Sequence, residues 1–427
     1  MKRIFTLAAS LASLAVLAMP EVQNLSVTQN NNRMVAISFS LSEKAIVTMD
    51  ITTNGVSIGA DNYQTIRDAF SNDDKFPAGK AVAAGQRLWT WRPTKEWPGF
   101  HFGSNEFAVK VQAWSFDNPP DYMVVDYDIR SNITFYATAT EIPNGGIKTA
   151  DPADAEALAQ LTNDIYRLKK IILRKIPAAG VKWRMGSPTD EKYRQADETP
   201  HYVTLTNDYY VAIYPLTRAQ CKRFFVTGDA NSALASIYPK SNQSYTGARG
   251  AIGSYCWPED GHDVSATSGF GKMRGMTGLR FDFLTEAEWE YACRAGTEGP
   301  WNGLTEDEVC WHALSNGSVD HYVGTKKPNE WGLFDMHGLA AEWVLDQYGE
   351  YPTDPVVAPQ GVTTNANLRI TRGGPINRKY NNAYTSAVST RSAYRHQFDP
   401  TQGNTTAPNG FGVRVSCPAV LPDWLRQ

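Results

Sequence analysis

The sequence has almost no excess charge of either sign. Its 427 residues include 41 lysines and arginines against 44 aspartates and glutamates, which gives a formal net charge of -3. Proteins that bind nucleic acid present clustered positive charge to the phosphate backbone, so the near balance argues against nucleic acid as a partner. With 42% hydrophobic and 20% charged residues, the composition is that of an ordered globular protein rather than a disordered chain.

Long apolar runs are missing after the first twenty residues, so no later segment is expected to span a membrane. At the start, Lys2 and Arg3 precede an apolar run from Ile4 to Leu17, which ends in small residues at Ala18. This order is typical of a secretory signal peptide. We expect residues 1–18 to be removed and the protein to be exported, to the periplasm or outside the cell. A membrane anchor fits less well, because the run is shorter than the ~20 residues of a spanning helix.

Cysteine is scarce, and no Cys-x-x-Cys pair occurs. The five cysteines are Cys221, Cys256, Cys293, Cys310 and Cys417. Only His312 lies close to one of them in the sequence, so a thiol-metal site has little support. An exported chain can form disulfides, but the odd count leaves at least one thiol unpaired. We expect one or two disulfides together with buried free thiols.

Residues 22–140 show apolar side chains at every second position, for example in Val35–Leu41 and Phe107–Ala113. Strands with one buried face alternate in this way, and turn sequences such as Thr53-Asn54-Gly55 separate the runs. We predict a small β-sandwich of immunoglobulin or fibronectin type. It contains no cluster of titratable groups, so the expected role is that of a spacer or docking module.

A linker helix is predicted over residues 151–175. Asp151 and Pro152 suit the N-cap and first turn of a helix. Apolar residues then recur at steps of three and four, at Leu158, Leu161, Ile165, Leu168 and Ile172. Such a helix packs on a neighbouring domain or forms a short coiled coil.

The clearest helix signal lies further along the chain. Thr285 and Glu288 have the spacing of a capping box, in which a hydroxyl and a carboxylate bind the first free amides of a helix. A helix should therefore begin at Glu286, and Gly296 should end it. We expect Trp289 to pack inward, while Glu286 and Glu290 face outward or bind locally.

Residues 176–422 combine many glycines and aromatics with irregular periodicity, which predicts one large domain of short elements and long ordered loops. Its motifs resemble, in order, those of the formylglycine-generating enzyme or sulfatase-modifying factor family, from about Ile176 to Ser416. The resemblance implies a variant of the C-type lectin fold, and an α+β chain overall. The motifs are Glu198-Thr-Pro-His-Tyr-Val, Leu216-Thr-Arg-Ala-Gln, Leu284-Thr-Glu-Ala-Glu-Trp, Val323-Gly-Thr, Glu342-Trp343, Arg372-Gly-Gly and Asn409-Gly-Phe-Gly.

The family's best-known activity oxidises a sulfatase cysteine to formylglycine, using copper held by two cysteines. A pair of soft thiolates selects monovalent copper. In the family this pair closely follows the Arg-Gly-Gly motif, and counting from Gly374 places it at Arg378 and Ala383. No cysteine lies between Trp311 and Ser416. We therefore expect no copper and no formylglycine formation. The alternative is another oxidation, of a protein or small-molecule thiol, at a remodelled site.

A second branch of the superfamily uses non-haem iron, with histidines from an additional helical domain. The seven histidines here include no His-x-x-x-His pair, and the domain in front is β-rich, so this branch fits poorly. His337, in the turn Asp-Met-His-Gly, is expected to be a structural residue.

The resemblance also implies a calcium site. Its ligands would be the side chains of Asp335 and Glu342 and the backbone carbonyls of Gly338 and Ala340. Calcium prefers several hard oxygens in a flexible arrangement. The alternative is that Glu342 only accepts hydrogen bonds in a calcium-free turn.

Arginines are expected to flank the family's groove. Arg378, Arg391 and Arg395 are candidate ligand-binding residues, because guanidinium groups bind carboxylate or sulfate in bidentate fashion. For Arg372 we expect a structural role. The polar, aromatic run Asn377–Thr390 indicates a remodelled groove, of the kind that suits adaptable binding. The leading hypothesis is an exported domain that binds a protein, peptide or small ligand without redox chemistry.

Overall fold

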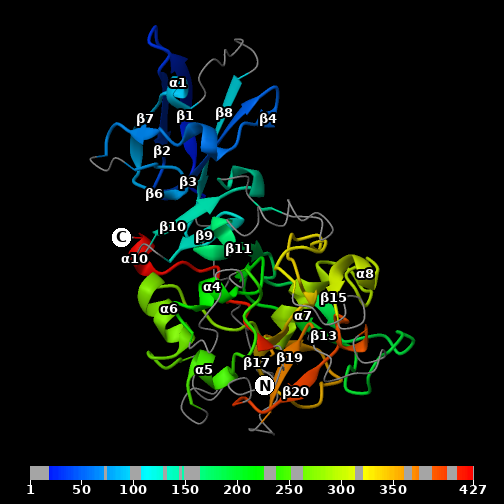
Figure 1. Cartoon of the computed structure of the whole chain (residues 1–427). Coiled ribbons are helices and arrows are strands. Elements are labelled where there is room, and N and C mark those ends of the chain that lie inside the picture. Colours follow the sequence, from blue (N-terminus) through cyan, green and yellow to red (C-terminus); the bar gives the residue numbers. More distant parts are fainter. Residues whose placement is uncertain are drawn as a thin grey trace, which may run out of the picture.

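The computed structural model is rich in sheet, and its helices are short (Figure 1). Within the residues that it describes, no helix combines the length and the apolar character needed to cross a membrane. The predicted signal peptide lies outside these residues. The described residues are 19–71, 75–96, 107–127, 132–143, 147–148, 164–225, 237–251, 263–312, 321–359, 368–374, 387–401 and 411–426.

The first part of the chain forms two sheets around a common core. One has the strand order β1 (Val22–Gln29), β2 (Val35–Leu41), β7 (Gly85–Trp91) and β5 (Arg67–Asp68). The other joins β4 (Val56–Ser57), β3 (Ala45–Thr53) and β6 (Lys80–Val82), with β8 (Phe107–Trp114) also paired to β3. Short turns of helix follow at η1 (Ala60–Tyr63) and α1 (Pro93–Glu96).

The core of this part confirms the alternation read from the sequence. Every second residue of β2 is buried, as expected for a strand with one face against the core. The core is aromatic and branched, and includes Ile37, Phe39, Val47, Met49, Ile51, Trp89 and Trp91. Trp89 and Phe39 meet edge to face, with ring centroids 5.1 Å apart.

The next hairpin belongs to the sheet of the C-terminal domain, which corrects the predicted boundary at residue 140. Strands β9 (Tyr122–Asp126) and β10 (Asn132–Tyr136) precede η2 (Ala139–Glu141). The sheet order is β10-β9-β11-β14-β22, in which β11 is Lys170–Ile176, β14 is Tyr209–Ala212 and β22 is Ser416–Pro418. Alternation in a sequence identifies a strand, but it does not say with which sheet the strand pairs.

The predicted linker helix is wrong for its C-terminal part. A single helical turn, α3 (Ile165–Leu168), is capped by the Asp164 side chain, and β11 follows as a strand between β9 and β14. The contiguous buried residues Ile171, Ile172 and Leu173 form the short apolar run of a strand covered on both faces, a pattern that helical spacing can imitate. Residues 151–163 lie outside the described part of the chain.

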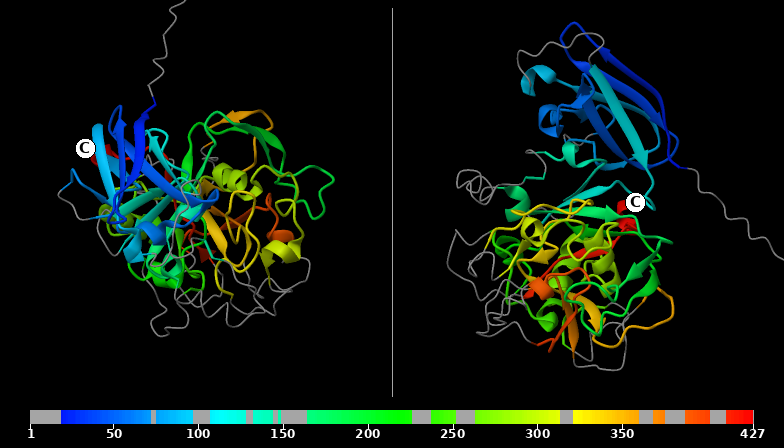
Figure 2. Two further views of the ribbon diagram at one scale, coloured as in Figure 1. Left: turned by 90° about the horizontal axis from the view of Figure 1, so that it is seen from above. Right: turned by 90° about the vertical axis from the view of Figure 1, so that its right-hand side faces the viewer.

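Figure 2 shows the N-terminal sheets, in blue, on one side of the C-terminal domain. The two parts meet where Gly79 and β6 lie beside β10. The backbone amide of Phe135 donates to the carbonyl of Gly79 at 2.9 Å. Lys80 Nζ donates to Asn132 Oδ1 and Thr134 Oγ1, each at 2.8 Å. These direct contacts fix one face of the N-terminal sheets against the C-terminal domain.

Short elements build the rest of the C-terminal domain. Its smaller sheets are β12-β13-β18, β15-β16 and β20-β19-β17-β21. The strands are β12 (Lys182–Met185), β13 (His201–Thr204), β15 (Cys310–Trp311), β16 (His337–Gly338), β17 (Ala341–Gln347), β18 (Val356–Val357), β19 (Arg369–Arg372), β20 (His396–Phe398) and β21 (Phe411–Gly412). The helices are α4 (Arg218–Cys221), α5 (Tyr245–Arg249), α6 (Gly269–Thr277), α7 (Glu286–Arg294), α8 (Glu306–Val309) and α10 (Asp423–Arg426).

Helix α7 confirms the predicted cap. Thr285 Oγ1 accepts a hydrogen bond from the Glu288 amide at 3.1 Å, and the Glu288 carboxylate accepts one from the Thr285 amide at 2.8 Å. The helix ends at Arg294, followed by two residues in the left-handed region. Its Glu286 and Glu290 are 3% and 0% exposed, so these side chains bind locally and do not face solvent.

The expected disulfides do not occur among the described cysteines. Cys221, Cys293, Cys310 and Cys417 are all free and buried, while Cys256 lies outside the described residues. Buried free thiols behave as small apolar side chains. The described part of the chain is therefore held together by packing and ion pairs.

Candidate functional site

The arginines expected to flank a groove form internal ion pairs. Arg391 is fully buried, and its NH1 donates to Glu191 at 2.6 Å and to Glu198 at 2.9 Å. Arg395 binds both carboxylate oxygens of Glu286, at 2.7 and 3.0 Å. Arg378 lies outside the described residues. The acids come from distant parts of the chain, which the sequence does not reveal, and they occupy the guanidinium donors that a ligand would need.

Arg372 has the structural role expected of it. Its NH1 donates to the carbonyls of Ala393 and Tyr394, both at 2.9 Å, and its NH2 binds the Glu290 carboxylate. Arg294 binds the same glutamate at 2.8 Å, so two cations hold the pKa of Glu290 below its usual value despite its burial. This network fastens α7 to β19 and to the segment before β20.

The turn expected to bind calcium is buried and partly satisfied by protein groups. Glu342 accepts from Trp289 Nε1 at 2.7 Å and from Arg414 Nε at 3.0 Å. Asp335 Oδ2 accepts from the Gly324 amide at 2.7 Å, whereas Asp335 Oδ1 is buried and has no partner in the described part of the chain. Burial raises the pKa of Asp335 to about 6.

The backbone around Gly338 has the tight geometry of that turn. Gly338 has a φ of 82°, and a Cβ there would meet the Trp311 carbonyl oxygen at 2.2 Å, so only glycine fits. The Gly338 carbonyl accepts from the Ala340 amide at 2.8 Å. Within the described residues no three His, Cys, Asp or Glu side chains converge as a metal site.

His337 is a structural residue, as predicted. Its Nδ1 lies 2.7 Å from the Thr390 carbonyl oxygen and its Nε2 lies 3.6 Å from Cys293 Sγ. Burial lowers the pKa of His337 to about 4 and raises the pKa of the Cys293 thiol to about 12. A reactive thiol-imidazole pair needs the opposite shift of the thiol, so the burial of this pair argues against a catalytic role.

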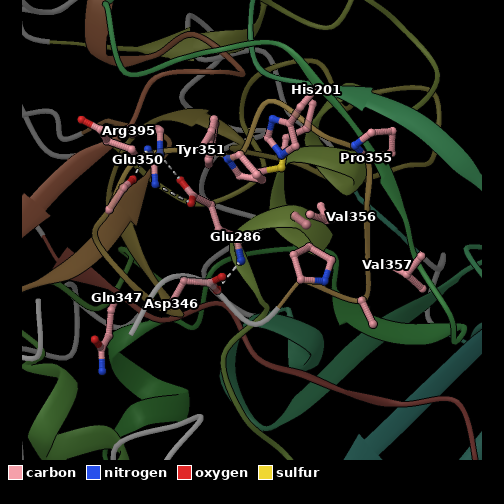
Figure 3. Close-up of a pocket in the computed structure, with 16 residues that line it drawn as sticks. His201, Glu286, Asp346, Gln347, Glu350, Tyr351, Pro355, Val356, Val357 and Arg395 are labelled. Carbon is pink, nitrogen blue, oxygen red and sulfur yellow. Dashed lines mark hydrogen bonds and ion pairs between the residues drawn. The ribbon is translucent and has the colours of Figure 1, made fainter. Parts of the chain in front are cut away.

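A cavity of about 1050 Å³ lies elsewhere, at the start of α7 and the end of β17. Figure 3 shows Pro355, Val356 and Val357 along one side, with Asp346, Glu286 and Arg395 along the other. Ligand cavities are typically apolar with a few convergent polar groups. This mixture of an apolar wall and a polar wall identifies the cavity as the candidate functional site.

Asp346 is the most perturbed acid of the cavity. Its Oδ2 accepts a hydrogen bond from the Glu286 amide at 2.6 Å. Burial, together with the negative charge of Glu286, raises the pKa of Asp346 to about 8. The carboxyl group is therefore mostly protonated at neutral pH. Strongly shifted acids in a cavity are a mark of functional sites.

Two aromatic side chains complete the polar wall. The guanidinium group of Arg395 lies over the Tyr351 ring, with 3.7 Å between Arg395 Cζ and the ring centroid. The centroid of the His201 ring is 4.6 Å from the centroid of the Tyr351 ring. The buried Tyr351 hydroxyl has no hydrogen-bond partner among the described residues. It is thus a polar group at the cavity that a ligand can satisfy.

The sequence reasoning missed Asp346, Tyr351 and His201 as site residues. One signal for Asp346 was available, since it directly follows the apolar run Trp343–Leu345, and an acid within a buried strand needs a special partner. The other two residues carry no such signal, because nothing local to them shows that they border a cavity.

Parts of this chain are similar in sequence to known proteins. The sequence profile of the "Sulfatase-modifying factor enzyme 1-like domain" matches residues 175–417, more than half of the chain. The formylglycine-generating enzyme of Mus musculus is 30% identical over 107 residues, which cover 21% of this chain and 28% of that protein. Serine/threonine-protein kinase pkn1 of Chlamydia pneumoniae is 24% identical over 232 residues, which cover 52% of this chain and 35% of that protein. The chain thus spans about a third or less of these relatives.

Two solved structures are similar in shape. PvdO from Pseudomonas aeruginosa has a TM-score of 0.43 at 23% identity, covering 58% of this chain and 94% of that one. Treponema denticola variable protein 1 has a TM-score of 0.42 at 20% identity, covering 58% and 95%. At this level, neither structure indicates what the present chain binds. The match over residues 175–417 shows that the chain belongs to the sulfatase-modifying factor family.

Proposed function

We propose that this chain is an exported, non-redox member of its family, whose C-type-lectin-like domain binds a ligand in the cavity at the start of α7. The observation that carries the proposal is the cavity itself. It combines an apolar wall with the carboxyl group of Asp346 and the unpartnered Tyr351 hydroxyl. Such a surface offers both apolar area and orienting polar groups to a ligand.

The chemistry of the sequence supports a non-redox role. The region that carries the family's copper-binding pair contains no cysteine from Trp311 to Ser416, and a monovalent copper site of the family type needs two thiolates. Among the described cysteines, Cys293 is buried with a raised pKa. We expect no formylglycine when a Cys-x-Pro-x-Arg peptide is incubated with this protein, copper and oxygen. Formylglycine in the peptide, detected by mass spectrometry, would overturn the non-redox assignment.

Ligand binding at the cavity is tested by blocking it. Val356→Trp places a bulky ring on the cavity wall at a half-buried position, while Val56→Trp changes an exposed residue of β4 by the same amount. Screening a small-molecule library by ligand-observed NMR should give binders that V56W retains and V356W loses. If V356W binds every hit as well as the original protein does, the cavity is not the ligand site.

For the N-terminal sheets, we infer an immunoglobulin- or fibronectin-like sandwich that acts as a spacer or docking module. Its support is the shared aromatic core of the two sheets and their fixed contact with β10. Export can be tested by fractionating cells that express the full chain. Recovery of the full-length, uncleaved protein in the cytoplasm would count against it.

We propose calcium at the turn that contains Asp335, with the carbonyls of Gly338 and Ala340 as further ligands. The buried, unpartnered Asp335 Oδ1 suits a hard cation. Glu342 is the weaker candidate, since Arg414 already balances its charge. Calcium should raise the melting temperature of the protein and leave that of Asp335→Asn unchanged. An equal rise in both would place the ion elsewhere.

A further inference from the structure

We propose that the cavity takes a primary amine on an apolar stem, with its ammonium group bound by Asp346. This inference rests on the proposed ligand-binding function and specifies the chemical class of the ligand. The shared chemistry is an alkylammonium group, which either a free amine or a lysine side chain of a peptide provides.

The geometry of Asp346 leaves one oxygen for a ligand. Oδ2 is held by the Glu286 amide at 2.6 Å. Oδ1 has no hydrogen-bond partner in the described part of the chain, and Asp346 lines the cavity. The side chain is thus fixed on one side and available on the other. A fixed carboxylate binds an incoming donor without the entropy cost of ordering it.

The charges around Asp346 favour a cation. Glu286 and Glu288 of α7 act on its charge. Glu350 and Tyr351, from the segment after β17, and His201, from β13, line the same cavity. The nearby cations are already engaged, since Arg395 and Arg372 both pair with Glu286. No salt bridge to Asp346 is present in the described part of the chain, although Arg395 lies close enough to act on its charge, and an ammonium group would supply a direct partner.

The apolar part of the lining suits an apolar stem. It consists of side chains without charge: Met185, Ala287, Pro352, Pro355, Val356 and Val357. Burying the methylenes of a stem against such side chains removes apolar surface from water and so favours binding. The volume of about 1050 Å³ is enough for a stem of several carbons.

Proton exchange accompanies binding. In the free protein the carboxyl group of Asp346 carries a proton below pH 8, since its pKa is about 8. When an ammonium ion binds, this proton leaves to solvent and the resulting carboxylate accepts a hydrogen bond from the ammonium nitrogen. Affinity should thus rise about tenfold per pH unit between pH 6 and pH 8, and then level off.

The test is calorimetry with n-hexylamine, hexan-1-ol and hexanoate at pH 6, 7 and 8.5, in two buffers of different ionisation enthalpy. We expect n-hexylamine to bind best, to release close to one proton at pH 7, and to bind about a hundredfold more tightly at pH 8.5 than at pH 6. A second arm with a blocked lysine amide distinguishes a peptide side chain from a free amine as the source.

Variants separate this inference from the proposed function. Asp346→Asn keeps an oxygen for the Glu286 amide and should lower the affinity for n-hexylamine at pH 8.5 at least tenfold, with loss of the pH dependence. Asp354→Asn, an exposed neighbour outside the cavity lining, should leave both unchanged. If hexan-1-ol or hexanoate binds more tightly than n-hexylamine, the amine class is wrong. If V356W also abolishes that binding, the cavity is still the ligand site. No binding of any of the three compounds also overturns the amine class.

Discussion

The carboxylate of Asp346 accepts a hydrogen bond from the backbone amide of Glu286, 2.6 Å away, at the first residue of α7. Thr285 binds the Glu288 amide of the same turn. Two side chains from different parts of the chain therefore satisfy free amides at the start of one helix. This links the folding of α7 to the end of β17 and makes the cavity wall part of the helix cap.

The pH dependence of stability should report on Asp346. Its pKa is raised to about 8 in the folded state, against about 3.9 in an unfolded chain. The folded protein then holds a proton that the unfolded chain has lost, so this contribution is full below about pH 4 and disappears as the pH rises to about 8. Relative to Asp346→Asn, the original protein should lose stability between pH 5 and pH 8.5, as urea unfolding can measure. A difference that is constant with pH would show an ordinary pKa for Asp346.

The buried ion pair of Arg391 should be sensitive to the loss of one partner. Arg391→Met leaves Glu191 and Glu198 inside the domain without their cation, at an expected cost of about 3–5 kcal/mol in the free energy of unfolding. Lys327→Met removes an exposed lysine paired with Glu308 and serves as the control, with no measurable change expected. A loss below about 1 kcal/mol for R391M would mean that the two acids find other partners.

The capping box of α7 has a modest and separable effect. Thr285→Ala removes the acceptor of the Glu288 amide and should lower the stability by about 1 kcal/mol. Thr285→Ser keeps the hydroxyl and should lose much less. Equal losses for the two variants in urea unfolding would show that the threonine methyl group, and not the hydrogen bond, makes the contribution.

The thiols should be unreactive in the folded protein. Cys221 and Cys293 are buried, and burial raises the pKa of each to about 12. Since the thiolate is the reactive form, neither should be alkylated by iodoacetamide at pH 8 until guanidinium unfolds the chain. Peptide mapping by mass spectrometry identifies the labelled residues. Rapid labelling of Cys293 in the folded protein would mean that its surroundings open readily.

The sequence predicts those structural features that depend on residues close together in the chain. The Thr285–Glu288 cap, the alternating strand Val35–Leu41 and the structural role of Arg372 were all expected and are all found. Each signal lies within a few residues, or within the motif order of a family. The family assignment follows from the same motifs, and the profile match confirms it.

Contacts between distant residues account for what the sequence does not predict. Arg391 and Glu198 are separated by 193 positions, and Asp346 and Glu286 by 60. A pattern along the chain does not say which buried acid meets which arginine, so Arg391 looked available for a ligand. For the same reason the cavity was missed, because its lining comes from β12, β13, α7 and the segment after β17.

The placement of the β9–β10 hairpin has a practical meaning for anyone who isolates the family domain. The profile match begins at residue 175, inside β11, whose preceding residues pair with β9 and with the end of β14. A fragment cut at that point would keep the family's sequence motifs but lose β9, β10 and most of β11. Val211 and Ala212 would lose their partners in β11, and an unpaired strand edge of this kind favours aggregation. A fragment that keeps these strand pairs would have to begin before Tyr122, outside the segment that the family shares.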